Sequence, residues 1–145
     1  MPLLNYTTSI APQKTVMEIQ TALAKAGASA IMANYDTDGN IIALSFKINA
    51  DGKEIAFKLP TAWEPVQKTL QRQRVSQRYQ TPEHALRVAW RITKDWVEAQ
   101  LAIIETQMVT TVQVFLPYAI TNNGQTVFEY MASNSELLLG AGNES

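Results

Sequence analysis

The sequence predicts an α+β fold in which a three-stranded antiparallel meander is flanked by helices, in the order α-β-β-β-α-α. Apolar and polar residues alternate with a period of two between residues 30 and 59, apolar residues recur at helical spacing over residues 15–26, and a long helical pattern covers residues 82–106. Alternation is typical of strands with one buried face, and a period near 3.6 is typical of amphipathic helices. The long helix would be the central element.

The first helix is expected at residues 15–26. The preceding dozen residues look extended, compatible with an edge strand or an arm. Thr15 and Glu18 have the spacing of a capping box, in which the hydroxyl and the carboxylate satisfy unpaired N–H groups. Gly27 then suits the position after the last helical residue.

Three strands are expected next, separated by turns at residues 36–40 and 50–52. Their apolar residues should face the helices at 15–26 and 82–106, because a three-stranded sheet needs cover on its apolar face. The expected core is Ile19, Leu23, Ile42, Leu44, Phe46, Ile48, Ile55, Phe57, Leu59, Leu86, Trp90, Val97 and Leu101.

A short helix and the central helix follow. Thr61 and Glu64 match a second capping box, and the short helix ends near Leu70 in a connecting loop. Thr81 is the expected N-cap of the central helix, with Pro82 at its first position, where a missing N–H costs nothing. The polar face should carry three ion pairs: Glu83–Arg87, Arg91–Asp95 and Lys94–Glu98.

The central helix has more apolar surface than one sheet can cover. Ile92, Trp96 and Ile103 are left for another partner, either a short segment capped by Thr110 or a second subunit, so a homo-oligomer is one expectation. Residues 126–132 should form a last short helix or strand. Residues 1–133 are predicted to be one α+β domain, and residues 134–145 a loose tail.

Composition excludes several classes of protein. Cysteine is absent, which removes disulfides and thiolate chemistry, and there is no signal peptide or apolar run long enough for a membrane span. A cytoplasmic protein is expected. Asp36, Asp38 and Asn40 resemble the start of a calcium loop, but Ile41 and Lys47 occupy its glycine and glutamate positions, which favours a simple turn.

No catalytic signature is present. His84 is the only histidine and is expected to be structural or solvated. Nucleophile-elbow, phosphate-loop and dinucleotide-binding motifs are all absent. We therefore expect a protein that is not an enzyme and has no metal or cofactor; serine or carboxylate catalysis is the least favoured alternative.

Charge is distributed very unevenly along the chain. Residues 1–67 carry a net charge of −1, residues 68–94 carry +6 and residues 95–145 carry −6. Arginine dominates the basic segment, which suits phosphate recognition, and an adjacent tyrosine could stack on a base of a single strand. The candidate residues for binding nucleic acid or phosphate are Lys68, Arg72, Arg74, Arg78, Tyr79, Arg87 and Arg91. The alternative is a solvated connector whose arginines pair with the acidic C-terminal third.

Several motifs resemble a known group of proteins. Asn5-Tyr6-Thr7-Thr8, RYQTPEHALRVAWRITKDWVEAQLAIIE and MVTTVQVFLPYA resemble a widespread set of small phage, prophage and other mobile-element proteins over about residues 4–130. The resemblance implies a mobile-element context and no particular catalytic residue. The element order also resembles double-stranded-RNA-binding domains, but the lysine cluster of that family is missing at residues 81–84.

These observations favour a non-enzymatic nucleic-acid-associated protein of a phage or mobile element, acting in the host cytoplasm, with single strands favoured. The alternative is a phage inhibitor or sponge of host defence that sequesters a host protein or an anionic nucleotide messenger. The sequence does not separate the two, because arginine and tyrosine serve phosphates in both.

Overall fold

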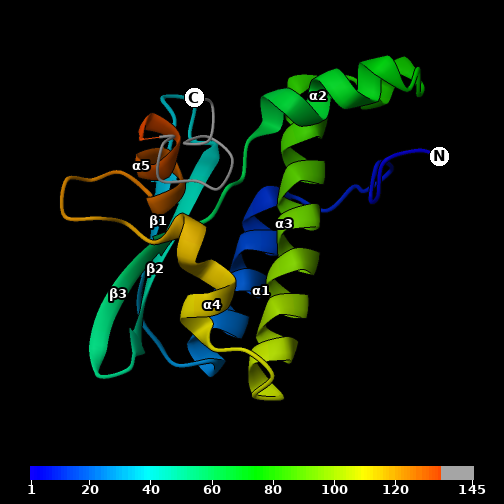
Figure 1. Cartoon of the computed structure of the whole chain (residues 1–145). Helices are drawn as coiled ribbons and strands as arrows, with labels where there is room; N and C mark the ends of the chain where they lie inside the picture. Colours follow the sequence, from blue (N-terminus) through cyan, green and yellow to red (C-terminus); the bar gives the residue numbers. More distant parts are fainter. Residues whose placement is uncertain (135–145) are drawn as a thin grey trace.

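The computed structural model describes residues 1–134, which form an α+β fold with one three-stranded antiparallel sheet (Figure 1). The predicted fold class is confirmed. In chain order the elements are α1 (Pro12–Lys25), β1 (Ala28–Tyr35), β2 (Ile41–Ala50), β3 (Lys53–Lys58), α2 (Trp63–Arg72), η1 (Gln77–Tyr79), α3 (Pro82–Glu105), α4 (Thr111–Phe115), η2 (Leu116–Tyr118) and α5 (Val127–Ser133).

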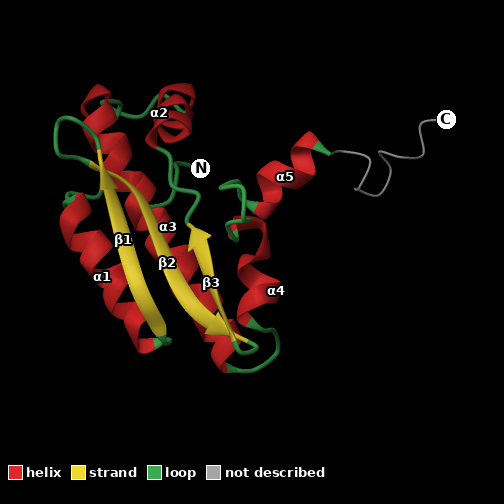
Figure 2. Cartoon of the chain, turned by 90° about the vertical axis from the view of Figure 1, so that its left-hand side faces the viewer, coloured by secondary structure: helices red, strands yellow, loops and turns green. Residues whose placement is uncertain are grey.

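The sheet is a meander in the order β1-β2-β3, and α1 and α3 cover one of its faces (Figure 2). The opposite edge of β3 is closed by residues 119–120, where the Ile120 N–H donates to the Ala56 carbonyl at 2.8 Å. The layers are therefore sheet on helices, as the alternating pattern predicts.

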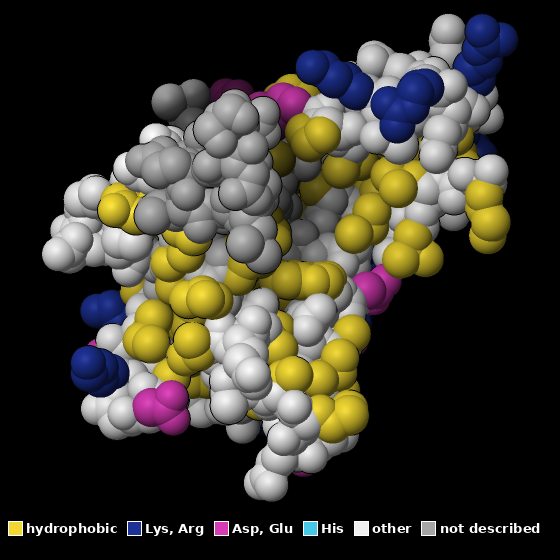
Figure 3. Space-filling model, viewed as in Figure 1, with side chains coloured by type: hydrophobic (Ala, Val, Ile, Leu, Met, Phe, Trp, Pro, Cys, Tyr) yellow, Lys and Arg dark blue, Asp and Glu magenta, His cyan; other side chains and the backbone are white. Residues whose placement is uncertain are grey.

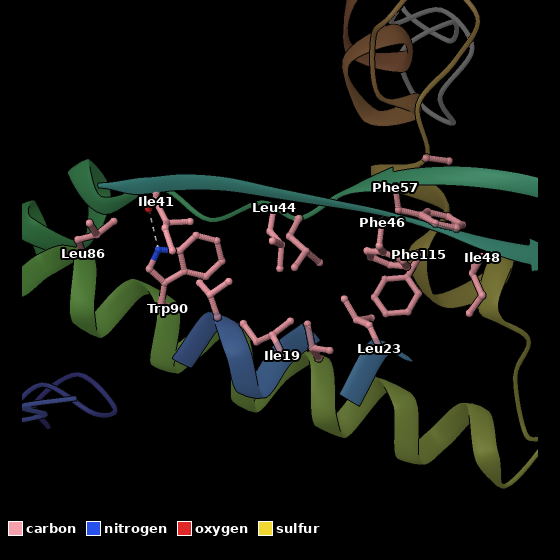
Figure 4. Packing of buried hydrophobic residues seen from close by; sticks show 14 residues of the cluster. Ile19, Leu23, Ile41, Leu44, Phe46, Ile48, Phe57, Leu86, Trp90 and Phe115 are labelled. Carbon is pink, nitrogen blue, oxygen red and sulfur yellow. Dashed lines mark hydrogen bonds between the residues drawn. The ribbon is translucent and has the colours of Figure 1, made fainter. Parts of the chain in front are cut away.

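Trp90 of α3 joins the helical layer to the sheet. Its ring is fully buried, and its indole N–H donates to the carbonyl oxygen of Ile41 at 3.0 Å (Figure 4). Further along the core, Phe46, Phe57 and Phe115 pack together with ring centroids 5.3–5.8 Å apart. Aromatic pairs in such clusters stabilise the fold by more than the burial of their apolar area alone.

The start of β2 departs from strict alternation. The pairing of β1 with β2 shifts between Asn34 and Tyr35, so that Tyr35 faces Ile41. As a result Ile41 is buried and Ile42 is 39% exposed, and the prediction that Ile42 belongs to the core is wrong. A bulge changes which residues face inward without any change in the apolar pattern.

Other predicted core residues fall into place. Leu44, Phe46, Ile48, Phe57, Leu59, Leu86, Trp90, Val97, Ile19 and Leu23 are buried, whereas Ile55 and Leu101 are partly buried against the same cluster.

Two predicted helix caps are wrong. Helix α1 begins at Pro12 after Ala11, so Thr15 lies inside the helix and is fully buried. Helix α2 follows Ala62, and the Thr61 hydroxyl instead bonds to Thr93 at 2.8 Å. Pro12 occupies the first helical position, so α1 starts three residues before Thr15, where the capping-box pattern placed the cap.

The other expected caps are confirmed. Thr81 accepts from the His84 N–H, and Thr110 forms a complete capping box with Gln113. The N-terminal residues form two successive turns instead of a strand, with the N–H groups of Tyr6 and Thr8 donating to Leu3 and Asn5. Of the predicted loose tail, residues 135–145 lie outside the described residues. Within residues 1–134, no helix combines the length and apolar character that crossing a membrane requires.

The bulge generates a testable difference between two neighbouring positions of β2. Leu44→Ala should lower the free energy of unfolding by about 2–5 kcal/mol, because it leaves a cavity in the core. Ile42→Ala should cost at most about 1 kcal/mol, because Ile42 is partly solvated. Chemical denaturation of both variants measures the difference, and equal losses would contradict the bulged register.

Candidate nucleic-acid interface

The end of α2 and the connector to α3 project from the body of the molecule, and we call residues 67–80 the basic arm (Figure 1). Its four cations, all exposed, are Lys68, Arg72, Arg74 and Arg78. The chain has no acidic residue between Glu64 and Glu83. Within residues 1–134, no carboxylate oxygen lies within 4.0 Å of these cations. Their charges are therefore directed to solvent.

The connector at the end of the arm has a defined conformation. Helix α2 ends at Arg72 with Gln73 as its C-cap, and Arg74 turns the chain with a φ of 55°. The Gln80 side chain donates to the Val75 carbonyl at 2.7 Å, and Gln67 donates to the Gln80 carbonyl at 2.8 Å. These side-chain hydrogen bonds hold the conformation of the connector, which has few apolar residues to pack against the body of the protein.

The N-terminal residues brace the arm. The Gln73 side chain accepts from the Leu3 N–H at 2.8 Å and donates to the Met1 carbonyl at 3.3 Å. Further along, the Asn5 side chain donates to Asp95 of α3 at 2.9 Å. The N-terminal segment thus connects the arm to the central helix.

Tyr79 lies at the base of the arm and is half-buried. The Arg78 guanidinium sits over its ring at 4.7 Å from the centroid, a cation–π contact. Tyr6 meets the same ring edge-on at 5.6 Å, and His84 lies 5.0 Å away. A base that stacked on Tyr79 would have to displace one of these neighbours, so this geometry suits Tyr79 to positioning Arg78.

His84 is buried and holds the N-terminal segment against α3. Its Nε2 lies 2.5 Å from the Tyr6 carbonyl oxygen, and the Arg87 Nη2 lies 3.2 Å from its Nδ1. The carbonyl needs a donor and the guanidinium needs an acceptor, so the contacts select the neutral tautomer with the proton on Nε2. Both ring nitrogens therefore form hydrogen bonds within the protein.

Arg87 and Arg91 differ from the cations of the arm. Both are only partly exposed, and Arg91 forms an ion pair with Glu18 of α1 at 2.9 Å. Of the three ion pairs predicted along α3, only Lys94–Glu98 forms, at 2.9 Å. The predicted pair Arg91–Asp95 is wrong, because Glu18 of the neighbouring helix reaches Arg91 and Asn5 occupies Asp95. The six candidate cations therefore divide into four exposed ones on the arm and two, Arg87 and Arg91, that contact other side chains on the helix face.

The turn after β1 uses its carboxylate for the backbone. Asp36 accepts from the N–H groups of Asn40 and Asp38, both at 2.9 Å, and from the Asn40 side chain at 3.2 Å. The N–H and side-chain donors of Asn40 hold the pKa of Asp36 below its usual value. No group of three potential metal-ligating side chains occurs among residues 1–134.

Sequence reasoning missed a groove beside the arm. It lies between α2, α3 and η2, has a volume of about 380 Å³, and is lined by Pro60, Thr61, Ala62, Pro65, Val66, Ala89, Ile92, Thr93, Trp96 and Tyr118. Trp96 also contacts Phe115 and Tyr118 edge-to-face at 5.6 and 5.5 Å, so the segment after Thr110 provides part of its cover. The lining comes from three stretches of the chain, residues 60–66, 89–96 and 118, which no local sequence pattern connects.

Comparisons of the chain with protein-family models, curated proteins and solved structures gave no match.

The turn at Asp36 predicts a pH dependence of stability. A lowered pKa means that folding favours the ionised carboxylate, a contribution present above about pH 3.9 and lost as the pH falls through the pKa of the folded state. Asp36→Ala should therefore unfold with a weaker pH dependence in this acidic range than the wild type. Denaturant unfolding at a series of pH values measures it. Asp38→Ala is the matched control, because that carboxylate accepts none of these hydrogen bonds. An unchanged pH dependence in Asp36→Ala would contradict the prediction.

Proposed function

We propose that this protein binds the phosphate backbone of a polynucleotide through the basic arm, without catalysing a reaction. The observation that carries the proposal is the exposure of Lys68, Arg72, Arg74 and Arg78 on one projecting, braced segment, with no carboxylate oxygen of residues 1–134 within 4.0 Å of their charged groups. Its resemblance to small mobile-element proteins supports a phage or prophage context.

The arrangement suits phosphates for two reasons. Cations that are already ion-paired gain little from a phosphate, whereas the solvated cations of the arm release the counterions of the nucleic acid when they bind. The arm also projects from the body, so that a strand can lie along it (Figure 3). Contacts of this type position a nucleic acid and carry no sequence information.

Arg78 is the best-positioned of the four cations. Its guanidinium rests on Tyr79, which is itself packed against Tyr6 and His84. A cation that is ordered before binding loses less conformational entropy when it meets a phosphate. Arg87 and Arg91 contribute to the surrounding field, while Arg87 contacts His84 and Arg91 pairs with Glu18 of α1.

Salt dependence tests the proposal. Four phosphate contacts predict a slope of log K against log salt of about −3 on single strands and about −3.5 on duplexes. Replacing all four arm cations with glutamine should remove most of the binding and the slope with it. Arg72→Ala alone should lower the slope by about one and weaken all sequences alike. Fluorescence anisotropy with labelled DNA at several salt concentrations measures these quantities.

A matched variant controls for net charge. Glutamine at four exposed lysines outside the arm, Lys25, Lys47, Lys53 and Lys58, changes the net charge equally and should retain the binding and its slope. Absence of binding to single-stranded and duplex DNA or RNA at micromolar protein would overturn the proposal. Tight binding of a small nucleotide without oligonucleotide binding would favour the sequestering function instead.

A further inference from the structure

The groove beside the basic arm is lined mainly by apolar side chains and contains two threonine hydroxyls. Thr61 and Thr93 bring their hydroxyl oxygens to 2.8 Å, and Thr93 is buried on α3. Around them Val66, Ile92 and Trp96 supply the apolar lining. Concave sites with an apolar wall and a few convergent polar groups are the usual form of a small-ligand site.

The two hydroxyls present only acceptors to the groove. The Thr93 hydroxyl lies 2.8 Å from the Ala89 carbonyl oxygen, which has no proton to give, so Thr93 donates its single proton there. The contact between the two threonines then requires Thr61 to donate to Thr93. Both protons are used within the protein, and the lone pairs that remain accept from a ligand.

One end of the groove is aromatic. Trp96 and Tyr118 line it, with ring centroids 5.5 Å apart and an angle of 82° between their planes, and Phe115 supports Trp96 from behind the lining. Rings held this way can stack on a planar ligand with little loss of conformational freedom. Stacking of bases on aromatic side chains is the sequence-tolerant part of single-strand recognition.

The groove is continuous with the arm along one face of α2. Pro65 lines the groove, Thr69 lies one turn further and donates to the Pro65 carbonyl, and Arg72 contacts the Thr69 hydroxyl at 3.4 Å. Arg72 lies seven positions beyond Pro65 along the helix, or about 10 Å of axis at ~1.5 Å per residue. That distance corresponds to about three stacked nucleotides at ~3.4 Å each. Figure 3 shows the same relation, with Lys and Arg side chains on the arm above an apolar hollow.

We propose that the groove receives a nucleobase of a single strand whose phosphates lie on the basic arm, and that its two threonine hydroxyls select bases carrying an exocyclic amino group. The inference rests on the proposed polynucleotide binding. The positive arm supplies the charge complementarity for a phosphate chain, and the acceptor pair supplies the selectivity. Cytosine presents an amino donor where uracil presents a carbonyl oxygen, so the two pyrimidines differ at the atom that would face the hydroxyls.

Three strands of equal length and charge separate the contributions. The probes are oligo(dC), oligo(dU) and an abasic strand, each of roughly 15 nucleotides, bound to the full-length protein at neutral pH. Oligo(dC) should bind about threefold to tenfold tighter than oligo(dU), because a carbonyl oxygen facing two acceptors leaves them unpaired. The abasic strand should bind about fivefold to a hundredfold weaker than oligo(dC), because it cannot stack.

A groove-filling variant completes the experiment. Ala62 lines the groove, is exposed and has an extended backbone, so Ala62→Phe fills the space without removing a core contact. It should abolish both preferences and leave the salt slope unchanged. Ala102→Phe, at an exposed position of α3 outside the groove, should keep both preferences.

The possible failures are distinguishable. Equal affinity of the wild type for all three strands, with a steep salt slope, would overturn the groove inference and leave the arm's function standing. Retention of the cytosine preference in Ala62→Phe would also overturn it. Absence of binding to every strand would overturn both proposals.

Discussion

The arrangement of the elements follows from the burial of apolar side chains on more than one side of α3. Apolar side chains lie around much of this helix, so the sheet and α1 pack on one part of it while α2, α4 and η2 pack on others. Trp90 joins α3 to the sheet, because its buried indole N–H finds its acceptor in the Ile41 carbonyl at the start of β2. The bulge that exposes Ile42 accompanies this arrangement at the same end of the sheet.

Covering α3 also sorts the basic residues into two groups. Arg87 and Arg91 lie on a face that the N-terminal segment and α1 approach, and there His84 contacts Arg87 and Glu18 pairs with Arg91. The arm packs on α3 near its base and projects beyond it, and its cations have no ion-pair partner within residues 1–134. A solvated cation can bind a phosphate directly, whereas a cation in an ion pair must first give up its carboxylate partner. Proximity of the groove to the arm follows from the same packing, since α2 forms one wall of the groove and carries the cations.

Much of the fold could be predicted from local patterns. Period-two alternation marked β2 and β3, the threonine-proline pair marked the start of α3, and Thr110 marked α4, because these signals act through neighbouring residues and hydrogen bonds within a turn. The predicted caps at Thr15 and Thr61 were wrong because these threonines form contacts with residues distant in the sequence. Each threonine satisfies its hydroxyl on α3, with Arg91 or Thr93, and a contact between segments distant in the chain leaves no trace in local spacing.

For the candidate site, the charge could be read from the residues alone: a segment with four cations and no acidic residue must be basic wherever it lies. Which cations face solvent depended on the folded chain, because Arg91 pairs with a glutamate 73 residues earlier in the sequence. The contacts of Thr61 with Thr93 and of Trp96 with Tyr118 likewise exist only in the folded chain. Hydrophobic burial and hydrogen bonding depend on distance in space, and the packing of helices on a bulged sheet sets those distances.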